Sequence, residues 1–401
     1  MRKEREDLAG QIGRDAVAGK GGENVTRLPR IAILFSQFGP FHVDRIEAVA
    51  QRLAGRAQVL AVEVASASHT YAWEVSGAVR GARKLTLFPG ARYEDLREGR
   101  KLAALWNAVS GCDRVFSGIP YSDPAIIALS WRLRLAGRRV VMMTESKRDD
   151  FPRVRQREWA KRVVLSSYDA AIVGGPRQAD YMRDLGFLRR PVLLGYDTVG
   201  IERVRSLAGE TAIRWQDRPF LYVGRFVEKK NLFVLLDAYA HYVWRSGEGA
   251  RRLLMVGDGP LKERLFQRAK ELGVSDRIEW PGFLDAQGAA QAMKGALALL
   301  LVSTTEQWGL VVNEAMAAGI PCIVSANVGA RETMVTDGEN GFVLHDTRDA
   351  GELSDLMARM ASDEESWKAM SKAATRRAPA GDVVHFADAV ENLIATELLH
   401  R

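Results

Sequence analysis

Short apolar runs alternate with longer amphipathic segments along most of the chain, from about residue 30 to residue 345. Runs of strand length predict buried β-strands, and apolar positions that recur every three to four residues predict helices. Their alternation is typical of βαβ units with parallel sheets. We expect a first series of strands at residues 30–35, 59–64, 84–88, 114–117, 139–144, 170–173 and 191–195, with helices between them, among them 42–53 and 93–109.

A second series begins after a polar, charged stretch at residues 203–218, with expected strands at 220–223, 253–256, 278–280, 298–302, 321–324 and 341–344. A chain of 401 residues is too long for one ordinary core, so two doubly wound α/β domains are predicted, joined near residues 196–207. From residue 349 the pattern is helical, with a break at Pro379 and Gly381. The expected parts are a disordered tail (1–28), an N-terminal domain (29–200), a C-terminal domain (201–378) and a last helix (379–401).

The formal net charge is +7, and basic residues are concentrated at 132–139 and 147–162. These runs predict either solvated helix faces or a surface for an anionic membrane, and the sequence leaves both open. No zinc-finger spacing, RNA-binding aromatic signature or long basic helix occurs, so nucleic acid is not an expected partner. No apolar stretch reaches the ~18 residues of a membrane span, and the charged N-terminus lacks the apolar core of a signal peptide. We expect a cytoplasmic location, peripheral on the inner face of the membrane if the basic runs bind lipid.

Two glutamates, Glu306 and Glu314, flank a strand-to-helix junction in the segment 306–314 (EQWGLVVNE). Gly309 lets the backbone approach a ligand, and the N–H groups at the start of the following helix favour phosphate oxygens. The two carboxylates could accept hydrogen bonds from hydroxyl groups on either side of a bound diphosphate. An ordinary acidic loop residue and an acidic helix residue would give the same pair, so the spacing alone is uninformative.

The sequences around these residues resemble the donor-binding half of family 4 retaining glycosyltransferases. The resemblance rests on residues 220–231 (FLYVGRFVEKKN), 256–260 (VGDGP), 306–325 (EQWGLVVNEAMAAGIPCIVS), 329–332 (GARE) and 337–344 (DGENGFVL), and spans about residues 219–345. It implies the GT-B architecture, in which two Rossmann-like domains face each other across a cleft. It also implies that the last helix crosses back to the first domain.

Three residues are the implied catalytic groups. Arg225 and Lys230 would face the nucleotide diphosphate, and Glu306 would contact hydroxyls of the transferred sugar. Preorganised cations stabilise the charge that develops on a departing diphosphate, which gives the first two a chemical reason. Lys229 is an alternative to Lys230, and the sequence does not decide between them, although family spacing favours Lys230.

Further residues are implied to bind the donor. Glu314 would contact the ribose, and the backbone of Gly309 and Leu310 would hold the diphosphate. Gly257 lies at the matching end of the next strand, and Phe283 follows the segment that holds the base, partly through backbone atoms. Base identity therefore cannot be read from these side chains.

The N-terminal half offers weaker candidates, Gly39 for binding of the donor and three further residues for contacts with the acceptor or the sugar. Gly39 follows the first strand, where glycosyltransferases of this family have a glycine-containing loop, and His42 begins the next helix. Glu145 lies at the carboxyl end of a strand, the usual ligand side of a parallel sheet, and Lys147 follows it. Many family members have a histidine near Glu145, so its role is open between donor sugar and acceptor.

The function implied is a retaining transfer of a sugar from a UDP- or GDP-sugar to a glycan, lipid or small-molecule acceptor, in surface polysaccharide or glycolipid synthesis. The chain contains no Asp-x-Asp, and its cysteines and histidines lack metal-ligand spacing, so neither a metal nor another cofactor is expected. Two other interpretations stay open, a nucleotide-sugar epimerase or hydrolase on the same fold and a catalytically silent sugar-nucleotide binder.

Overall fold

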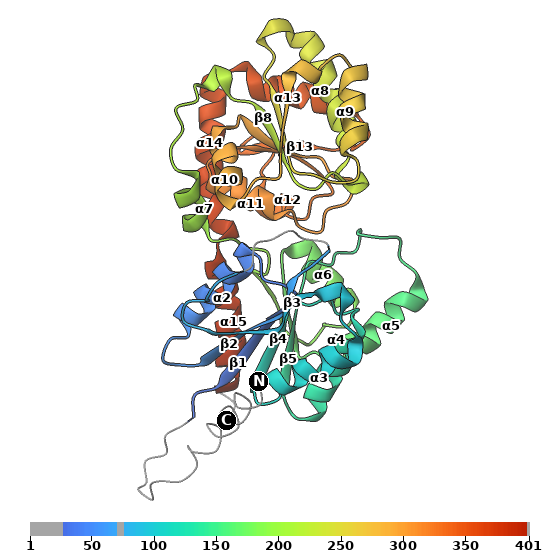
Figure 1. Cartoon of the computed structure of the whole chain (residues 1–401), viewed down its shortest axis with the longest axis vertical. Coiled ribbons are helices and arrows are strands. Elements are labelled where there is room, and N and C mark those ends of the chain that lie inside the picture. The colour runs from blue at the N-terminus through green and yellow to red at the C-terminus, as the bar shows by residue number, and fades with distance from the viewer. Residues whose placement is uncertain (1–26, 70–75, 399–401) are drawn as a thin grey trace, which may run out of the picture.

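Two α/β domains lie one above the other in the computed structural model, which describes residues 27–69 and 76–398 (Figure 1). The tail expected at 1–28 is almost wholly outside the described residues. The N-terminal domain is built on a parallel sheet with the strand order β3-β2-β1-β4-β5-β6-β7. Its strands are β1 (Arg30–Phe35), β2 (Gln58–Ala67), β3 (Arg83–Arg92), β4 (Arg114–Ser117), β5 (Arg139–Thr144), β6 (Ala170–Val173) and β7 (Val192–Leu194).

The C-terminal domain repeats this plan with the parallel order β10-β9-β8-β11-β12-β13. Its strands are β8 (Phe220–Val223), β9 (Leu253–Val256), β10 (Ile278–Gly282), β11 (Ala298–Leu301), β12 (Cys322–Ser325) and β13 (Gly341–Leu344). In both sheets the order reverses direction beside the first strand of the domain. Ligands of open parallel sheets bind outside the carboxyl ends of the strands at such a point, which lies between β1 and β4 and between β8 and β11.

Helices cover both faces of each sheet. The N-terminal helices are α2 (Pro40–Arg52), α3 (Glu98–Val109), α4 (Pro124–Leu135), α5 (Arg155–Leu165) and α6 (Pro176–Asp184). The C-terminal domain has α7 (Ile201–Ala208), α8 (Leu232–Ser246), α9 (Lys262–Glu271), α10 (Ala286–Gly295), α11 (Leu310–Ala317), α12 (Arg331–Met334), α13 (Ala350–Ser362) and α14 (Glu364–Arg377). Successive residues of a strand enter cores on opposite faces, as Ile31 and Ala32 do in β1. Because these strands are buried on both faces, they appear in the sequence as continuous apolar runs.

The structure corrects two of the predicted helical segments. Residues 93–109 form a short 3-10 turn, Tyr93–Asp95, and a separate helix α3, because Leu96 and Arg97 are extended. The C-terminal helical region is broken at Asp363, before the predicted break at residue 379. Asp363 has extended dihedral angles and its carboxylate accepts a hydrogen bond from Ser366 N at 2.7 Å, which caps α14.

The last helix, α15 (Val383–Leu398), returns to the N-terminal domain and packs along α2 (Figure 1). Phe386 and Val390 are fully buried in the N-terminal core, together with strand residues such as Ile33. Arg52 of α2 forms an ion pair with Asp388 at 2.6 Å. The chain therefore crosses between the domains twice, once near residue 199 and once near residue 381.

Replacement of Phe386 by alanine should destabilise the protein by about 3–5 kcal/mol, because it leaves a cavity in the N-terminal core. Val384 lies on the same helix but is 39% exposed, so Val384→Ala should change the free energy of unfolding by less than about 0.5 kcal/mol. Chemical denaturation measures both. Equal losses would show that α15 is not docked in this way.

Candidate functional site

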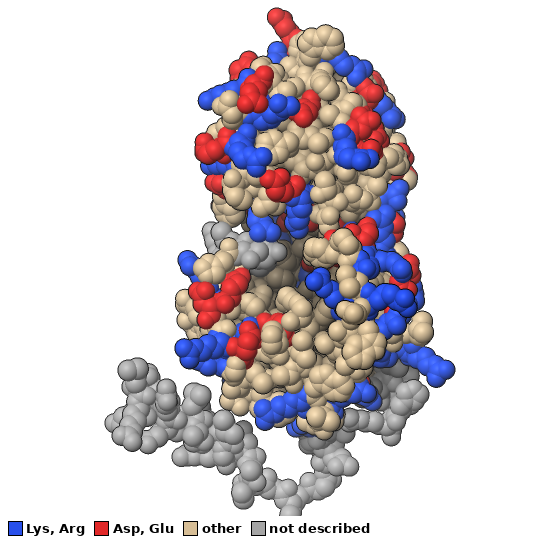
Figure 2. Space-filling model, turned by 90° about the vertical axis from the view of Figure 1, so that its right-hand side faces the viewer, with Lys and Arg blue, Asp and Glu red and all other residues tan. Residues whose placement is uncertain are grey.

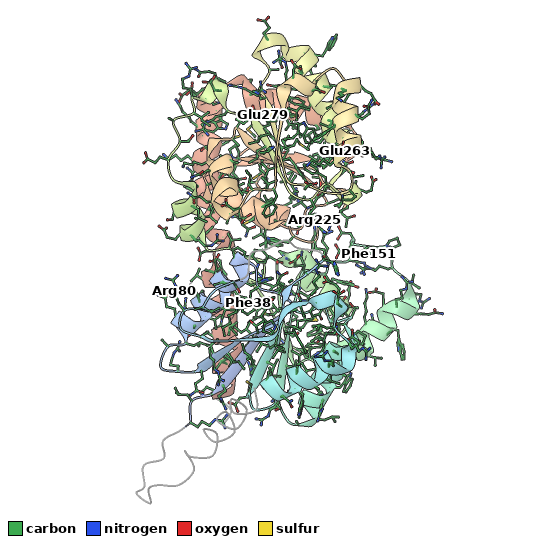
Figure 3. The ribbon with its side chains drawn as sticks, viewed as in Figure 1. Phe38, Arg80, Phe151, Arg225, Glu263 and Glu279 are labelled. Carbon is green, nitrogen blue, oxygen red and sulfur yellow. The ribbon has the colours of Figure 1, made fainter. Side chains whose placement is uncertain are left out.

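The surface is hollowed between the domains (Figure 2). Loops from both domains meet there. Gln307, in the loop after β11, donates a hydrogen bond to Asp150 Oδ2 in the loop after β5, at 3.3 Å. Figure 3 shows Arg225 at the lower edge of the C-terminal domain and Phe151 at the upper edge of the N-terminal domain. The loops that carry Glu306 and Glu145 therefore meet in one region.

Glu306 is held at the edge of this hollow by two side chains. Lys230 forms an ion pair with Glu306 Oε2, and Ser303 Oγ donates a hydrogen bond to the same oxygen at 3.1 Å. Glu306 is 8% exposed, and its backbone forms a β-bridge with Val328. A carboxylate fixed in this way is preorganised to accept hydrogen bonds from a ligand.

The two candidate lysines have different environments. The Lys230 side chain is 13% exposed and paired with Glu306, whereas Lys229 is an exposed residue. Asn231 fixes the turn that carries both, because its amide donates to Val302 O at 3.2 Å and to Thr347 O at 2.7 Å. The geometry therefore places Lys230, and not Lys229, beside the Glu306 carboxylate. Arg225 is exposed, and its carbonyl oxygen accepts a hydrogen bond from Tyr222 at 2.9 Å.

Helix α11 begins directly after this loop. Gly309 precedes Leu310 with φ 101°, and a Cβ added at Gly309 would lie 2.8 Å from a methyl carbon of Leu301. The N-cap residue is Gly309 itself, which makes no side-chain capping hydrogen bond. The first N–H groups of a helix have no intrahelical partner and carry the positive end of the helix dipole. The backbone at Gly309 and Leu310 can therefore bind an anion such as a diphosphate.

Glu314 lies one turn further along α11. Burial raises its pKa to about 7; the nearby Arg203 opposes this rise and Asp44 adds to it. Arg203 and Asp44 form an ion pair between the two domains, at 2.8 Å. Near neutral pH the carboxyl group of Glu314 thus changes between a hydrogen-bond donor and an acceptor.

Gly257 and Phe283 lie at the ends of the neighbouring strands. A Cβ at Gly257 would come within 1.9 Å of Gly224 O, so only glycine allows the ends of β8 and β9 to approach this closely. Gly257 N also donates to Gly282 O at 2.8 Å. Phe283 is 66% exposed, directly after β10. The structure thus gives Gly257 a packing role and presents the Phe283 ring on the surface.

On the N-terminal side, Gly39 is the N-cap residue of α2, and His42 lies in the first turn of this helix. Gly39 N donates to His42 Nδ1 at 3.0 Å, and the imidazole stacks on Phe35 with ring centres 4.0 Å apart. Burial, together with the nearby Arg45 cation, holds the pKa of His42 well below its usual range. The ring is therefore neutral near pH 7, with its proton on Nε2 because Nδ1 accepts a hydrogen bond.

Glu145 belongs to a buried cluster that sequence reasoning missed. Burial raises the pKa of Glu145, and it also raises the pKa of Asp197 well above its usual value, which the adjacent Glu145 carboxyl raises further. Arg45 lies 3.9 Å from Asp197 and donates to Thr198 O at 2.9 Å. Two carboxyl groups beside one arginine favour a shared proton. The Glu306 charge also raises the pKa of Glu145 and the Lys229 charge lowers it, so charges of the C-terminal domain act on this carboxyl.

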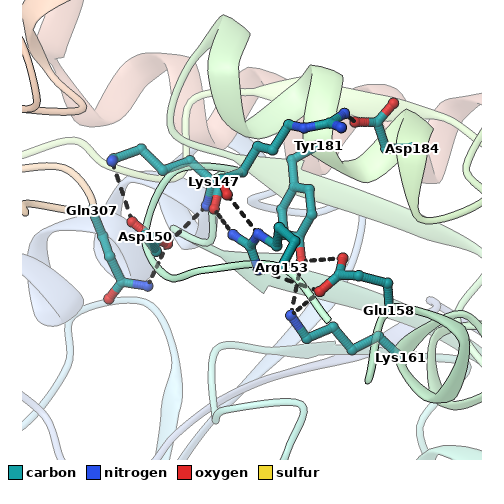
Figure 4. Close-up of polar contacts among 9 residues, drawn as sticks. Lys147, Asp150, Arg153, Glu158, Lys161, Tyr181, Asp184 and Gln307 are labelled. Atoms are coloured by element: carbon teal, nitrogen blue, oxygen red, sulfur yellow. Dashed lines mark hydrogen bonds and ion pairs between the residues drawn. The ribbon is translucent and has the colours of Figure 1, made fainter. Parts of the chain in front are cut away.

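Lys147 is placed differently from the prediction, which had it contact the sugar or acceptor. It is fully buried, and its ammonium group is 3.0 Å from Asp149. The same group is 3.3 Å from Asp150 (Figure 4). A lysine buried in this way is stabilised by its acidic partners. We therefore leave Lys147 out of the acceptor site.

Trp308 packs between the two domains, a role that sequence reasoning also missed. It is 2% exposed and packs against the turn between β6 and α6, where a Cβ at Gly174 or Gly175 would lie 2.6 Å or 2.9 Å from its ring. The Gly174-Gly175 pair was the available signal, because adjacent glycines can mark a close approach of another side chain as well as a turn. Within residues 27–69 and 76–398 no group of three or more His, Cys, Asp or Glu side chains has a metal-binding arrangement.

The pattern of the family described as "Glycosyl transferases group 1" matches residues 207–377. The chain is 32% identical to the lipopolysaccharide 1,6-galactosyltransferase of Salmonella typhimurium over 188 residues, which cover 45% of this chain and 49% of that protein. It is 31% identical to the N-acetyl-alpha-D-glucosaminyl L-malate synthase of Bacillus anthracis over 169 residues, 42% of each chain. The chain thus spans about half the length, or less, of these curated relatives.

Solved structures match almost the whole chain. Sucrose-phosphate synthase from Thermosynechococcus elongatus superimposes with a TM-score of 0.71 at 20% identity, over 93% of this chain and 100% of that one. The Anabaena protein HepE in complex with UDP gives a TM-score of 0.69 at 17% identity, over 92% of this chain and 100% of that one. Likeness at this identity establishes the fold alone, as two Rossmann-like domains across a cleft. Residues 207–377 are therefore similar to the group 1 glycosyl transferases, and the two domains of the chain have the predicted GT-B fold.

Proposed function

We propose that this protein transfers a sugar from a UDP- or GDP-sugar to the hydroxyl group of an acceptor. The observation that carries the proposal is the Lys230–Glu306 ion pair beside the uncapped N-terminus of α11. Together they offer a cation and backbone N–H groups to a diphosphate and a carboxylate to sugar hydroxyls, within one short loop. The matched family and the enzymes that share it support the assignment.

The proposed reaction retains the configuration at the anomeric carbon. The acceptor oxygen bonds to the anomeric carbon on the face from which the diphosphate leaves, the bond from that carbon to the diphosphate oxygen breaks, and the hydroxyl proton passes to a diphosphate oxygen. No nucleophilic side chain is required. Arg225 and Lys230 would stabilise the charge on the leaving group, so we propose that no metal ion takes part.

Lys230→Ala should lower the rate of nucleotide release from the donor by about 10²–10³-fold, because a preorganised charge at the leaving group is lost. Arg225→Ala should have an effect of the same kind. Lys229→Ala is the matched control, because Lys229 is exposed and the ion pair with Glu306 is formed by Lys230. The assay measures release of UDP or GDP in the presence of EDTA. Wild-type turnover by the Lys230 variant, or loss of wild-type activity in EDTA that manganese restores, would contradict the proposal.

The elevated pKa of Glu314, about 7, predicts a pH-dependent affinity for the donor. If ribose hydroxyls donate to this carboxylate, binding requires its ionised form. The affinity for UDP-glucose should then rise about tenfold between pH 6 and pH 8, as the ionised fraction of the free protein increases. The diphosphate of a sugar nucleotide does not titrate in this interval. Calorimetry of Glu314→Gln should show a flat profile, and an unchanged slope would assign the titration to another group.

We also propose that the acceptor is presented at an anionic membrane surface. Helix α5 stands out from the side of the N-terminal domain (Figure 1), and of its residues only Leu165 is buried. Trp159 is 68% exposed on this helix, and Phe151 in the preceding loop is 72% exposed. Arg155 and Arg157 are exposed beside them. Aromatic and basic side chains on one projecting surface match the interface of an anionic bilayer.

The expectation of membrane binding rested on the basic residues at 147–162, and only some of these side chains are free to meet a membrane. Lys147 is buried, Lys161 is bonded to Glu158 at 2.9 Å, and Arg153 contacts Tyr181 at 2.7 Å (Figure 4). These side chains hold the loop and helix together and are not available to lipid. Among the described residues, no helix is long and apolar enough to cross a membrane.

Replacement of Trp159 by serine together with Arg155→Ala should reduce co-sedimentation with vesicles that contain phosphatidylglycerol. Each arginine near an anionic surface contributes about 1 kcal/mol, so the loss should be at least fivefold and should shrink as salt rises. Trp244→Ser is the matched control, because Trp244 is 85% exposed in the C-terminal domain. Binding that is absent in the wild type, or indifferent to lipid charge, would remove the membrane from the proposal.

A further inference from the structure

The loop that carries Glu306 is held by the opposite domain on both its backbone and its side chains. Gln178, on α6 of the N-terminal domain, donates its amide hydrogen to Gln307 O at 2.8 Å. The Gln307 side chain in turn donates to Asp150 Oδ2 at 3.3 Å (Figure 4). Gln307 is therefore fixed from two directions by residues that lie outside its own domain.

Each of these partners is itself fixed. Gln178 is fully buried, and the described residues supply no donor to its Oε1 atom, so its bond to Gln307 is the contact that orients the amide. Asp150 is 6% exposed and accepts from Lys147 N at 2.9 Å. Groups buried with defined partners hold their positions, because rotation would leave a polar atom without a hydrogen bond.

The positions of the two residues that flank Gln307 depend on these hydrogen bonds. Glu306 precedes it, with its carboxylate against Lys230. Trp308 follows it and is buried against Gly174 and Gly175 of the N-terminal domain. A shift of the Gln307 carbonyl would therefore move the carboxylate that is proposed to contact the sugar.

We propose that Gln178, assisted by Asp150, is a positioning residue for the donor sugar: the N-terminal domain sets the place of the Glu306 carboxylate by holding Gln307. This inference rests on the proposed function of Glu306. Its consequence is that the sugar-binding half of the donor site is complete only when the domains are in contact. Binding of the nucleotide half depends on Glu314, Gly309 and Leu310 within the C-terminal domain, and so depends less on Gln178.

The test uses Gln178→Met, which keeps the volume of the side chain and removes its donor. Calorimetry compares the affinities for UDP-glucose and for UDP, with GDP-mannose and GDP as the second pair of probes. Loss of one hydrogen bond of this kind corresponds to a roughly fivefold to tenfold weaker binding of the sugar nucleotide, with less than about a twofold change for the free nucleotide. A general loss of structure would weaken both ligands alike.

Arg177→Met is the matched control. Arg177 is the neighbouring residue on α6 and also reaches the C-terminal domain, where it contacts Glu332 at 2.7 Å and Ala326 O at 3.0 Å rather than Gln307. It also lies 3.7 Å from Asp149 of its own domain. In Arg177→Met, the ratio of the affinity for the sugar nucleotide to the affinity for the free nucleotide should equal that of the wild type. A second variant, Gln307→Met, removes the bond to Asp150 and should change the ratio in the same direction as Gln178→Met if the first variant folds poorly.

The outcomes separate the two proposals. A wild-type ratio in both Gln178→Met and Gln307→Met, or an equal change in Arg177→Met, would overturn the positioning role while the protein still binds its donor. A wild-type protein that binds none of the four probes would instead overturn the proposed function.

Discussion

The side chain of Asn313 ties together the three segments on which the arrangement of the domains depends. Its amide group donates to Asp197 O at 3.0 Å in the first crossing between the domains and to Gly381 O at 3.3 Å in the second. Its oxygen accepts from Trp308 Nε1 at 3.1 Å. The two crossings also bond to each other, since Val199 N donates to Gly381 O at 3.0 Å. Because Asn313 lies on α11, the helix proposed to hold the diphosphate is anchored where the domains join.

The candidate site divides its chemistry between the two domains. The C-terminal domain supplies positive charge and backbone donors, with Lys230, Arg225 and the start of α11 on one side of the hollow. The N-terminal domain supplies carboxyl groups, with Glu145 and Asp197 beside Arg45. The C-terminal domain adds the Glu306 carboxylate beside Lys230, so the proposed site draws on charged groups of both domains. The proposed transfer therefore depends on contact between them.

Buried polar groups at the junction make this contact specific. Gln178, Asn313 and Asp197 are each 2% exposed or less, and the loss of one partner would leave a buried polar atom at a cost of about 1–3 kcal/mol. Apolar packing alone tolerates small slides between surfaces, whereas directional bonds do not. The packing of Trp308 on adjacent glycines adds a shape constraint at the same place.

The sequence by itself predicted the two series of strands through local periodicity. The resemblance of contiguous motifs to a known family indicated Arg225, Lys230, Glu306, Gly309 and Glu314 as donor-side residues. Their roles in the donor site remain proposals. Only the tertiary structure decided that Lys230, and not Lys229, lies against Glu306, because adjacent residues of one turn point in different directions. It also removed Lys147 from the site and brought Arg45, Gln178 and Asp197 into it. Those contacts join residues more than a hundred positions apart, as in the pairs Arg45–Asp197 and Gln178–Gln307, and such pairs leave no local pattern in the chain.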